Sequence, residues 1–244
     1  MRKTYHQPMA LSAIECLKKR RLPKLRETFF IFFLTALILA PHSLRAEVPT
    51  LEDLVSRIQE NYEKAGDLKA GFIQETTIKT LKKTEREEGV VYLKKPKKML
   101  WDYTRPKAKK LVINPKKAWL YVPDDNIVYV QDAKKVLNSR LLIKFLTGVG
   151  RLKEDFQVRY THPRETDERG NYLLELVPRQ AGLGIDRLLL TIDRDDYRIV
   201  SCSLTDLYGN LTKIAFRDLK VNNNLPDSLF TFSPPPGANV QAVP

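Results

Sequence analysis

Residues 89–103 form two runs on either side of a basic corner, Lys95-Pro96-Lys97-Lys98, and alternate positions of each run carry bulky apolar side chains. Because successive side chains of a strand point to opposite faces, this alternation predicts two β-strands joined by a turn. One face of the predicted pair is apolar apart from Lys95, and it carries Val91, Leu93, Met99, Trp101 and Tyr103. Such a face has to be covered. The cover is either more protein, which makes an ordinary core, or a ligand, which makes a carrier.

The first 46 residues have the three parts of a secretory signal peptide. A basic segment precedes an apolar run over residues 29–40, and a small residue, Ala46, stands at the expected cleavage site. The basic segment is long, and both Met1 and Met9 are compatible with its start. An uncleaved anchor is the alternative, but about 12 apolar residues fall short of the ~20 that a spanning helix needs. We therefore expect export and removal of residues 1–46.

Removal of this leader changes both the charge and the cysteine count. The leader carries nine Lys and Arg against two Glu, so the net charge falls from +13 to +6. Cys16 leaves with the leader, and the remaining Cys202 then has no partner for an intramolecular disulfide. No cysteine for lipid attachment follows the apolar run. We therefore expect a soluble exported protein that is stabilised by its core alone.

The rest of the chain begins with an amphipathic helix and continues as a series of strands. Thr50 has the residue type of an N-cap, apolar residues follow at helical spacing, and Gly66 marks the helix end. From Leu68 the apolar period changes to two, and turn residues then separate short alternating runs. The predicted strands are residues 68–78, 86–95, 98–104, 109–114, 118–122, 127–132, 156–161, 172–178, 187–193, 198–206 and 211–221. A second short helix is predicted over residues 138–148, and residues 229–237 close the chain as an apolar segment stopped by prolines.

This pattern predicts a mainly β fold in a single domain, residues 47–244. Short links join antiparallel neighbours, and about eleven strands in a flat open sheet would leave long exposed edges. We therefore expect one strongly bent sheet, an incomplete, half-closed antiparallel β-barrel of about 11 strands. A barrel of this size encloses more space than its own side chains fill. The two helices would lie across it as a lid.

The sequence offers little for catalysis or metal binding. After the leader it holds one histidine, His162, and one cysteine, Cys202, which do not make a hydrolase triad or a zinc site of the Cys/His type. Paired carboxylates such as Asp124 and Asp125 fall at turns, where solvation explains them. We predict that the protein is not an enzyme and needs no cofactor or metal.

The lysine clusters fall at the ends of predicted strands, where charge discourages edge pairing. They include Lys94-Lys95, Lys97-Lys98, residues 107–110 and Lys116-Lys117. Export argues against a nucleic acid partner. We favour solvated strand ends, and a basic rim that contacts an anionic membrane or an acidic partner is the alternative.

Apolar side chains remain in excess, and they favour a lipid-sized cavity. The strand residues Phe72, Trp101, Tyr103, Trp119 and Tyr121 are predicted to share one face. The helices add a second set, and the candidate cavity residues are Ile58, Phe72, Val91, Leu93, Met99, Trp101, Tyr103, Trp119, Tyr121, Leu142 and Phe145. Burying an acyl chain gains ~0.8 kcal/mol per methylene, so about 16 carbons are worth roughly 10 kcal/mol. A filled core is the alternative interpretation.

Several short motifs in order along the chain resemble those of a known family. They are Phe72-Ile73-Gln74, Gly89 followed by Leu93-Lys94-Lys95-Pro96 and Trp101, Trp119-Leu120-Tyr121, and Phe230-Thr231-Phe232-Ser233-Pro234-Pro235-Pro236-Gly237. Together with the leader and the first helix, they are similar to the LolA family of periplasmic outer-membrane lipoprotein carriers. The motifs are short, but their order and spacing extend over residues 50–240.

The resemblance implies an incomplete eleven-stranded barrel with a helical lid and no catalysis. It implies a periplasmic, monomeric carrier whose cavity takes the acyl chains of lipoproteins. Cargo would come from an inner-membrane lipoprotein-releasing ABC transporter and go to an outer-membrane lipoprotein receptor. Lid closure and docking would involve Lys95, Pro96 and Met99. A periplasmic lipid-sensing domain, or a domain of this fold that binds another envelope lipid, is the alternative.

Two positions depart from the family pattern. The residue before the corner proline is usually arginine in the family, which ties the lid shut, and here it is Lys95. Lysine lacks the forked donors of arginine, so the resemblance predicts weaker or different closure. Met99 stands where the family has a bulky apolar docking residue. Replacement of Lys95 is predicted to weaken cargo release or docking and to leave the fold intact.

Overall fold

The computed structural model describes residues 48–139, 152–180 and 184–243. The predicted leader therefore lies outside the described residues. The helices are α2 (Leu51–Lys64), α3 (Ala133–Ser139) and α5 (Leu152–Asp155), with short 3-10 turns η1 (Pro123–Asp125) and η2 (Asp227–Phe230). The strands are β1 (Asp67–Ile78), β2 (Lys83–Lys94), β3 (Lys98–Arg105), β4 (Lys109–Ile113), β5 (Lys117–Val122), β6 (Ile127–Asp132), β7 (Phe156–Tyr160), β8 (Tyr172–Pro178), β9 (Ile185–Ile192), β10 (Ile199–Asp206), β11 (Leu211–Val221) and β12 (Asn239–Ala242).

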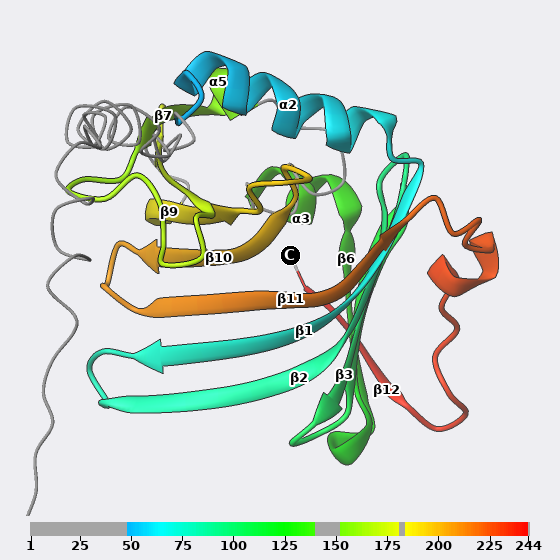
Figure 1. The fold of residues 1–244 in the computed structure, drawn as a ribbon. Coiled ribbons are helices and arrows are strands. Elements are labelled where there is room, and N and C mark those ends of the chain that lie inside the picture. The colour runs from blue at the N-terminus through cyan, green and yellow to red at the C-terminus, as the bar shows by residue number, and fades with distance from the viewer. Residues whose placement is uncertain (1–47, 140–151, 181–183, 244) are drawn as a thin grey trace, which may run out of the picture. The chain divides into compact units, whose positions relative to one another are not determined.

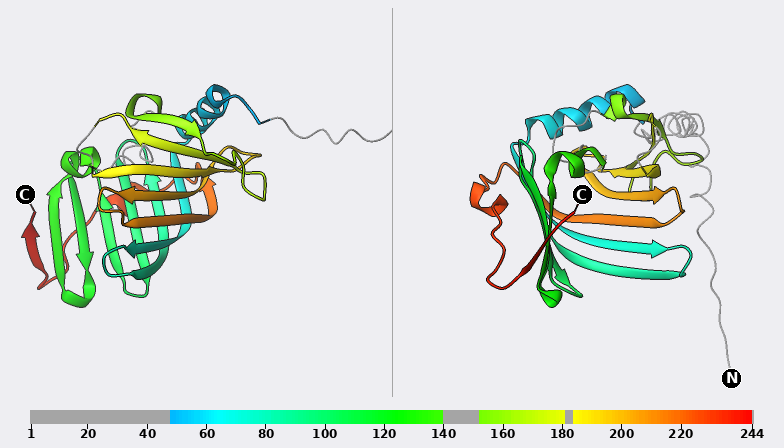
Figure 2. Two further views of the ribbon diagram at one scale, coloured as in Figure 1. Left: turned by 90° about the vertical axis from the view of Figure 1, so that its left-hand side faces the viewer. Right: turned by 180° about the vertical axis from the view of Figure 1, so that it is seen from behind.

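All twelve strands of the described residues belong to one sheet, in the order β12-β6-β5-β4-β3-β2-β1-β11-β10-β9-β8-β7. Neighbouring strands are antiparallel except for β12, which pairs with β6 in parallel. The sheet bends strongly, so that β3 to β6 stand across from β9 to β11 (Figures 1 and 2). Its edges, β7 and β12, do not pair with each other. The prediction of an incomplete barrel is confirmed, and the strand that the prediction lacked is the short C-terminal β12.

Helix α2 forms as its sequence predicts. The Thr50 hydroxyl caps the first turn by accepting a hydrogen bond from the Asp53 backbone N–H at 3.2 Å. Glu52 and Asp53 lie in that turn, where acidic side chains favour the helix dipole. Leu54, Val55 and Ile58 are the buried residues of the helix. Figure 1 shows α2 lying across one end of the bent sheet.

The second predicted helix, residues 138–148, lies mostly outside the described residues. The described helix α3, Ala133–Ser139, overlaps only the first two residues of that prediction. At the start of α3 the Asp132 carboxylate accepts a hydrogen bond from the Lys134 backbone N–H at 2.7 Å. Leu142 and Phe145, two of the candidate cavity residues, lie outside the described residues.

The main core lies between α2 and the inner face of the bent sheet. Alternate residues of β1, β2 and β3 point inward, because their side chains alternate along each strand. Fully or nearly fully buried members of this core include Ile58, Phe72, Val91, Leu93 and Met99. Gly89 permits the close approach of β2 to β3, since a Cβ atom there would lie 2.1 Å from the Asp102 backbone oxygen.

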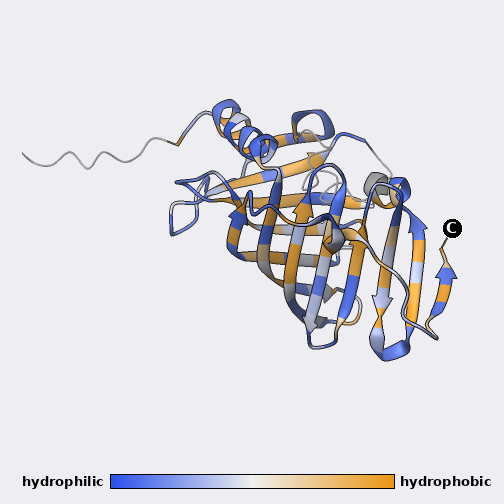
Figure 3. Cartoon of the chain, turned by 90° about the vertical axis from the view of Figure 1, so that its right-hand side faces the viewer, coloured by the Kyte–Doolittle hydropathy of each residue, from blue (hydrophilic) through white to orange (hydrophobic). Residues whose placement is uncertain are grey.

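A second, smaller core lies on the outer face of the sheet. Its buried members are Leu100, Val112, Leu225 and Phe230, with Trp119 and Phe232 packed against them. The C-terminal segment that supplies Leu225 and Phe230 crosses the outer face of the strands (Figure 3). The outer face of β3 and β4 is therefore covered by the chain itself. The apolar segment predicted at residues 229–237 is part of this cover.

Candidate functional site

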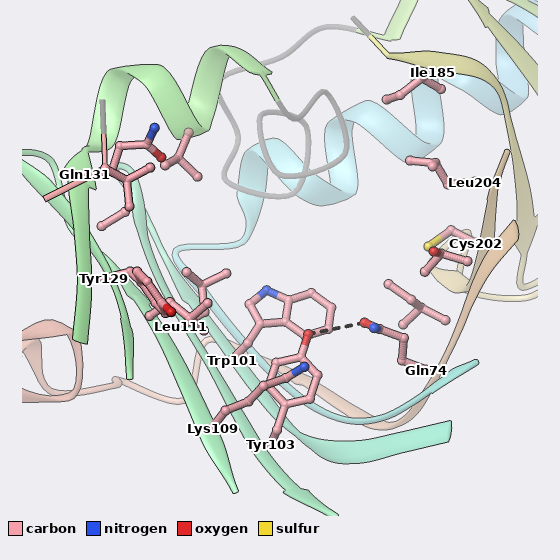
Figure 4. Close-up of a pocket in the computed structure, with 16 residues that line it drawn as sticks. Gln74, Trp101, Tyr103, Lys109, Leu111, Tyr129, Gln131, Ile185, Cys202 and Leu204 are labelled. Carbon is pink, nitrogen blue, oxygen red and sulfur yellow. Dashed lines mark hydrogen bonds between the residues drawn. The ribbon is translucent and has the colours of Figure 1, made fainter. Parts of the chain in front are cut away.

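A cavity of about 750 Å³ lies in the bend of the sheet. One wall comes from β3 to β6, with Trp101, Leu111 and Leu120 among its side chains. The opposite wall comes from β9 to β11, with Ile185 and Leu204 among its side chains. Figure 4 shows side chains from the two walls facing one another across open space. The bend that was predicted from strand number thus encloses a mostly apolar space.

Trp101 and Tyr103 are predicted cavity residues that the structure places in the cavity wall. The Trp101 ring lies edge-on to Phe72, with ring centroids 4.6 Å apart, and Tyr103 does the same at 5.0 Å. Trp101 donates its indole N–H to the Met99 sulfur at 2.9 Å. Phe72 and Met99 therefore lie behind the wall and hold the two larger rings in position.

Five predicted cavity residues belong to the packed core under α2. Ile58 and Met99 have no exposed surface, Val91 is 1% exposed and Leu93 is 5% exposed. Phe72, at 2%, is equally inaccessible. For these positions the alternative interpretation, a filled core, describes the structure. Burial also removes Met99 from the exposed rim where a docking residue is expected.

The placement predicted for Trp119 and Tyr121 is wrong. Both rings lie against Phe232 on the outer face, with ring centroids 6.1 and 5.8 Å apart respectively. The register explains the reversal: Trp101 pairs with Leu111, and Leu111 pairs with Leu120, so Leu120 shares the inner face. The prediction placed Trp119 and Tyr121 on the inner face because their side chains are large. Cross-strand pairing, and not side-chain size, determines which face each residue takes.

Lys95 joins the β2–β3 corner to the end of α2. Its ammonium group donates hydrogen bonds to the backbone carbonyls of Tyr62 and Glu63, and the distance to the Glu63 oxygen is 3.0 Å. Partial burial lowers the pKa of Lys95, and the nearby Glu63 carboxylate opposes that shift. Pro96 is exposed at the corner. A lysine thus contacts two carbonyls of the last helical turn without the forked geometry of arginine.

A row of polar side chains closes one end of the cavity wall. Tyr103 donates its hydroxyl to the Gln74 amide oxygen at 3.2 Å, and the Gln74 amide nitrogen donates to Glu87 at 3.1 Å. The Lys109 ammonium lies 2.5 Å from the other Glu87 oxygen and 4.3 Å from the Tyr103 ring centroid. The sequence-based interpretation of Lys109 as a solvated strand end therefore missed its place in the cavity wall. The period-two alternation of β4, which puts Lys109 on the same face as Leu111, is the signal that could have found it.

Cys202 lies in the wall opposite Trp101. Its thiol is 1% exposed, and burial raises the pKa of the thiol to about 12. The thiol therefore stays protonated at neutral pH and behaves as a small apolar side chain. Cys202 therefore contributes to the apolar lining of this wall.

The described residues do not gather into a recognisable catalytic or metal centre. No group of three or more His, Cys, Asp or Glu side chains in this part of the chain is placed to hold a metal ion. His162, the histidine considered for catalysis, is exposed in the connection between β7 and β8. Within residues 48–139, 152–180 and 184–243, no helix combines the length and apolar character of a membrane span. What the geometry offers is an apolar space with one polar end.

The sequence profile of the family described as "Outer membrane lipoprotein carrier protein LolA" matches residues 63–233. The chain belongs to the LolA family. This match begins in α2 and extends past η2, so it includes every strand of the cavity wall. Membership confirms the resemblance drawn from the short motifs.

Curated members of the LolA family align with most of this chain. An outer-membrane lipoprotein carrier protein of Methylococcus capsulatus is 29% identical over 76% of this chain and 86% of that protein. A protein of the same description from Methylobacillus flagellatus is 29% identical over 83% of this chain and 93% of that protein. An uncharacterised conserved protein from Thermus thermophilus has a similar fold, with a TM-score of 0.51 and 15% identity over 80% of this chain and all of that one.

Proposed function

We propose that this LolA-family protein is a periplasmic carrier that binds the acyl chains of lipoproteins in the cavity between β3–β6 and β9–β11. The observation that carries the proposal is the cavity itself, about 750 Å³ with Trp101, Leu111, Leu120 and Leu204 in its walls. Ligand pockets in proteins span ~300–1,000 Å³, so the space suits a lipid tail rather than a water cluster. Family membership supports the same function, since curated relatives are named lipoprotein carriers.

The apolar lining provides the driving force for carriage. Each buried methylene gains ~0.8 kcal/mol, so a chain of about 16 carbons that enters the cavity gains roughly 10 kcal/mol relative to water. A carrier has to release this chain again, and we assign a part in release to the open edges of the sheet and to the corner where Lys95 contacts the end of α2. The protein needs no covalent chemistry and no cofactor for this cycle.

Transfer requires a donor and an acceptor at the two membranes. We assign the donor role to an inner-membrane lipoprotein-releasing ABC transporter and the acceptor role to an outer-membrane lipoprotein receptor. The carrier would act as a monomer after removal of residues 1–46. The resemblance and the names of the relatives support these partners, and nucleic acid has no part in the cycle.

The test is to express the full-length gene, to purify the mature protein from the periplasm and to identify its cargo by solvent extraction and mass spectrometry. Acyl-modified cysteine peptides in the extract, and release of lipoproteins from inner-membrane vesicles by the purified protein, are the expected results. An extract that contains glycerolipids without acylated peptide, together with no release from vesicles, would instead assign the cavity to another envelope lipid. An extract without any acyl chain would contradict carriage altogether.

A further inference from the structure

The polar end of the cavity is built from neighbouring positions on four consecutive strands. Gln74 on β1 pairs with Glu87 on β2, and Tyr103 on β3 pairs with Lys109 on β4. Gly89 lies between the two pairs, opposite both Phe72 and Tyr103. Figure 4 shows Gln74, Tyr103 and Lys109 together at one end of the cavity, away from Ile185 and Gln131. The side chains of Gln74, Glu87, Tyr103 and Lys109 are called the polar row below.

The polar row contains both ends of an ion pair, and this pairing sets its charge. Lys109 and Glu87 lie 2.5 Å apart, with side chains that are 30% and 22% exposed. The second Glu87 oxygen accepts from Gln74, so both oxygens of the carboxylate are occupied. The lysine charge is therefore neutralised within the row, and an ammonium group has three N–H donors, so it can donate to a ligand as well as to Glu87. A half-buried, neutral cluster of this kind offers donors without offering net charge.

The position of the row determines which part of a ligand it meets. Gln74, Tyr103 and Lys109 line the same cavity as the apolar residues Leu204 and Ile185. The Lys109 side chain is 30% exposed, and Ile185 and Leu204 lie towards the other end of the cavity in Figure 4. An acyl chain that fills the apolar part thus leaves its polar head beside Lys109, because burial of a polar head in the apolar part would cost several kcal/mol.

We propose that the polar row is a specificity site that selects acyl chains with an uncharged ester or amide head and discriminates against free fatty acid anions. Lys109 donates to a carbonyl oxygen of the head, and Glu87 prevents the same lysine from acting as an anion site. The inference rests on the acyl-chain binding proposed above and names the head chemistry that this binding favours. It makes Glu87 a determinant of specificity through electrostatic cancellation rather than through contact with the ligand.

The test compares two ligands with the same tail, 1-monopalmitoylglycerol and palmitate, at pH 8. A Trp119→Phe background leaves Trp101, in the cavity wall, as the fluorescent reporter, since the chain holds 2 tryptophans. The measured quantity is the ratio of the two dissociation constants. We expect wild-type protein to bind the glyceride more tightly, and Glu87→Gln to move the ratio towards palmitate by about tenfold, because it leaves Lys109 as an unbalanced cation.

Two further variants keep the result interpretable. Glu88→Gln removes a carboxylate one residue along β2, where Glu88 pairs with Arg86 instead of Lys109, and should leave the ratio unchanged. Lys109→Met removes the cation and leaves the Glu87 carboxylate unbalanced, so it should move the ratio away from palmitate. This variant also tests the inference if Glu87→Gln does not fold. A ratio that stays within about twofold of wild type in both row variants would overturn the inference. Failure of both ligands to bind wild-type protein would instead contradict the proposed function.

Discussion

The ammonium group of Lys95 donates a hydrogen bond to the backbone carbonyl of Glu63 at 3.0 Å, and this contact joins the β2–β3 corner to the last turn of α2. The same ammonium also donates to the Tyr62 carbonyl. These oxygens lie at the C-terminal end of the helix, where the helix dipole favours a cation. A single side chain from the sheet thus supports the end of the helix that covers the main core.

Lys95→Met is expected to weaken the attachment of α2 without unfolding the protein. Loss of a charged hydrogen bond at a half-exposed site should lower the free energy of unfolding by about 1–2 kcal/mol. Hydrogen exchange of the amides in residues 51–64 should accelerate more than exchange in β9 and β10. Lys97→Met removes the same charge from the same corner and retains the Lys95 contacts, so it is the matched control. Equal exchange rates in the two variants would show that Lys95 does not hold the helix.

A buried carboxylate attaches the C-terminal segment, which covers the outer face of the sheet, to the start of β1. Asp67 is 7% exposed and accepts hydrogen bonds from the backbone N–H groups of Asn223 and Leu225 at 2.6 and 2.9 Å. Desolvation raises the pKa of Asp67, but the hydrogen bonds from Leu225 and Asn223 outweigh this effect, and the net pKa lies below its ordinary value. The ionised carboxylate is thus the form that stabilises the fold.

Asp67→Asn should therefore lower the free energy of unfolding by about 2 kcal/mol at pH 7, because its amide NH2 replaces an acceptor with a donor. The pH dependence has a definite sign. A depressed folded-state pKa contributes stability above the unfolded pKa of ~3.9, and this stability is lost as the pH falls through the folded-state pKa. Urea unfolding between pH 6 and pH 2 should show a smaller loss of unfolding free energy in the variant than in the wild type. If the unfolding free energies of the two proteins fall in parallel with pH, Asp67 is not the group responsible for the acid destabilisation.

The sequence predicted the first helix and most strands because the evidence for each of them is local. Thr50 and the apolar spacing after it define α2, and the turn residues between short alternating runs define most strands. It did not predict β12, whose four residues are all exposed and are held by pairing with β6. A strand of this kind has no apolar periodicity to detect, so only the tertiary partner reveals it.

The candidate site was harder to predict than the fold. Trp101 and Tyr103 were found because a strand with two large inward rings is conspicuous, whereas Trp119 has the same appearance and faces outward. β5 carries large apolar side chains on both faces, Leu120 towards the cavity and Trp119 on the outer face, so side-chain size alone does not distinguish the faces. Lys109 was missed for a related reason: its partner Glu87 is 22 residues away in the sequence, and only the register of β2 to β4 brings the two together.

Leu204→Trp should test whether the cavity volume is used. Leu204 lines the cavity from β10, so a larger side chain there fills space that an acyl chain would occupy. We expect the affinity for 1-monopalmitoylglycerol to fall by about tenfold. Because the space is open, the loss of unfolding free energy should be smaller than the ~1–3 kcal/mol that overpacking a filled core costs. Leu189→Trp places the same residue on the adjacent strand at a side chain that is 38% exposed, and it should retain affinity. Similar affinities in both variants would mean that ligand binds elsewhere.

The thiol of Cys202 gives a probe of the same cavity that does not depend on fluorescence. Because burial raises its pKa to about 12 and leaves it 1% exposed, the thiolate fraction at pH 8 is roughly one in ten thousand. In a Cys16→Ser background, a disulfide reagent such as Ellman's should therefore modify the native protein at least about a hundredfold more slowly than the protein in ~8 M urea. Saturating 1-monopalmitoylglycerol should slow the native reaction further, since Cys202 lies in the cavity wall. A native rate close to that of the unfolded chain would show that the wall opens to water, and a rate that ligand does not change would place the acyl chain away from β10.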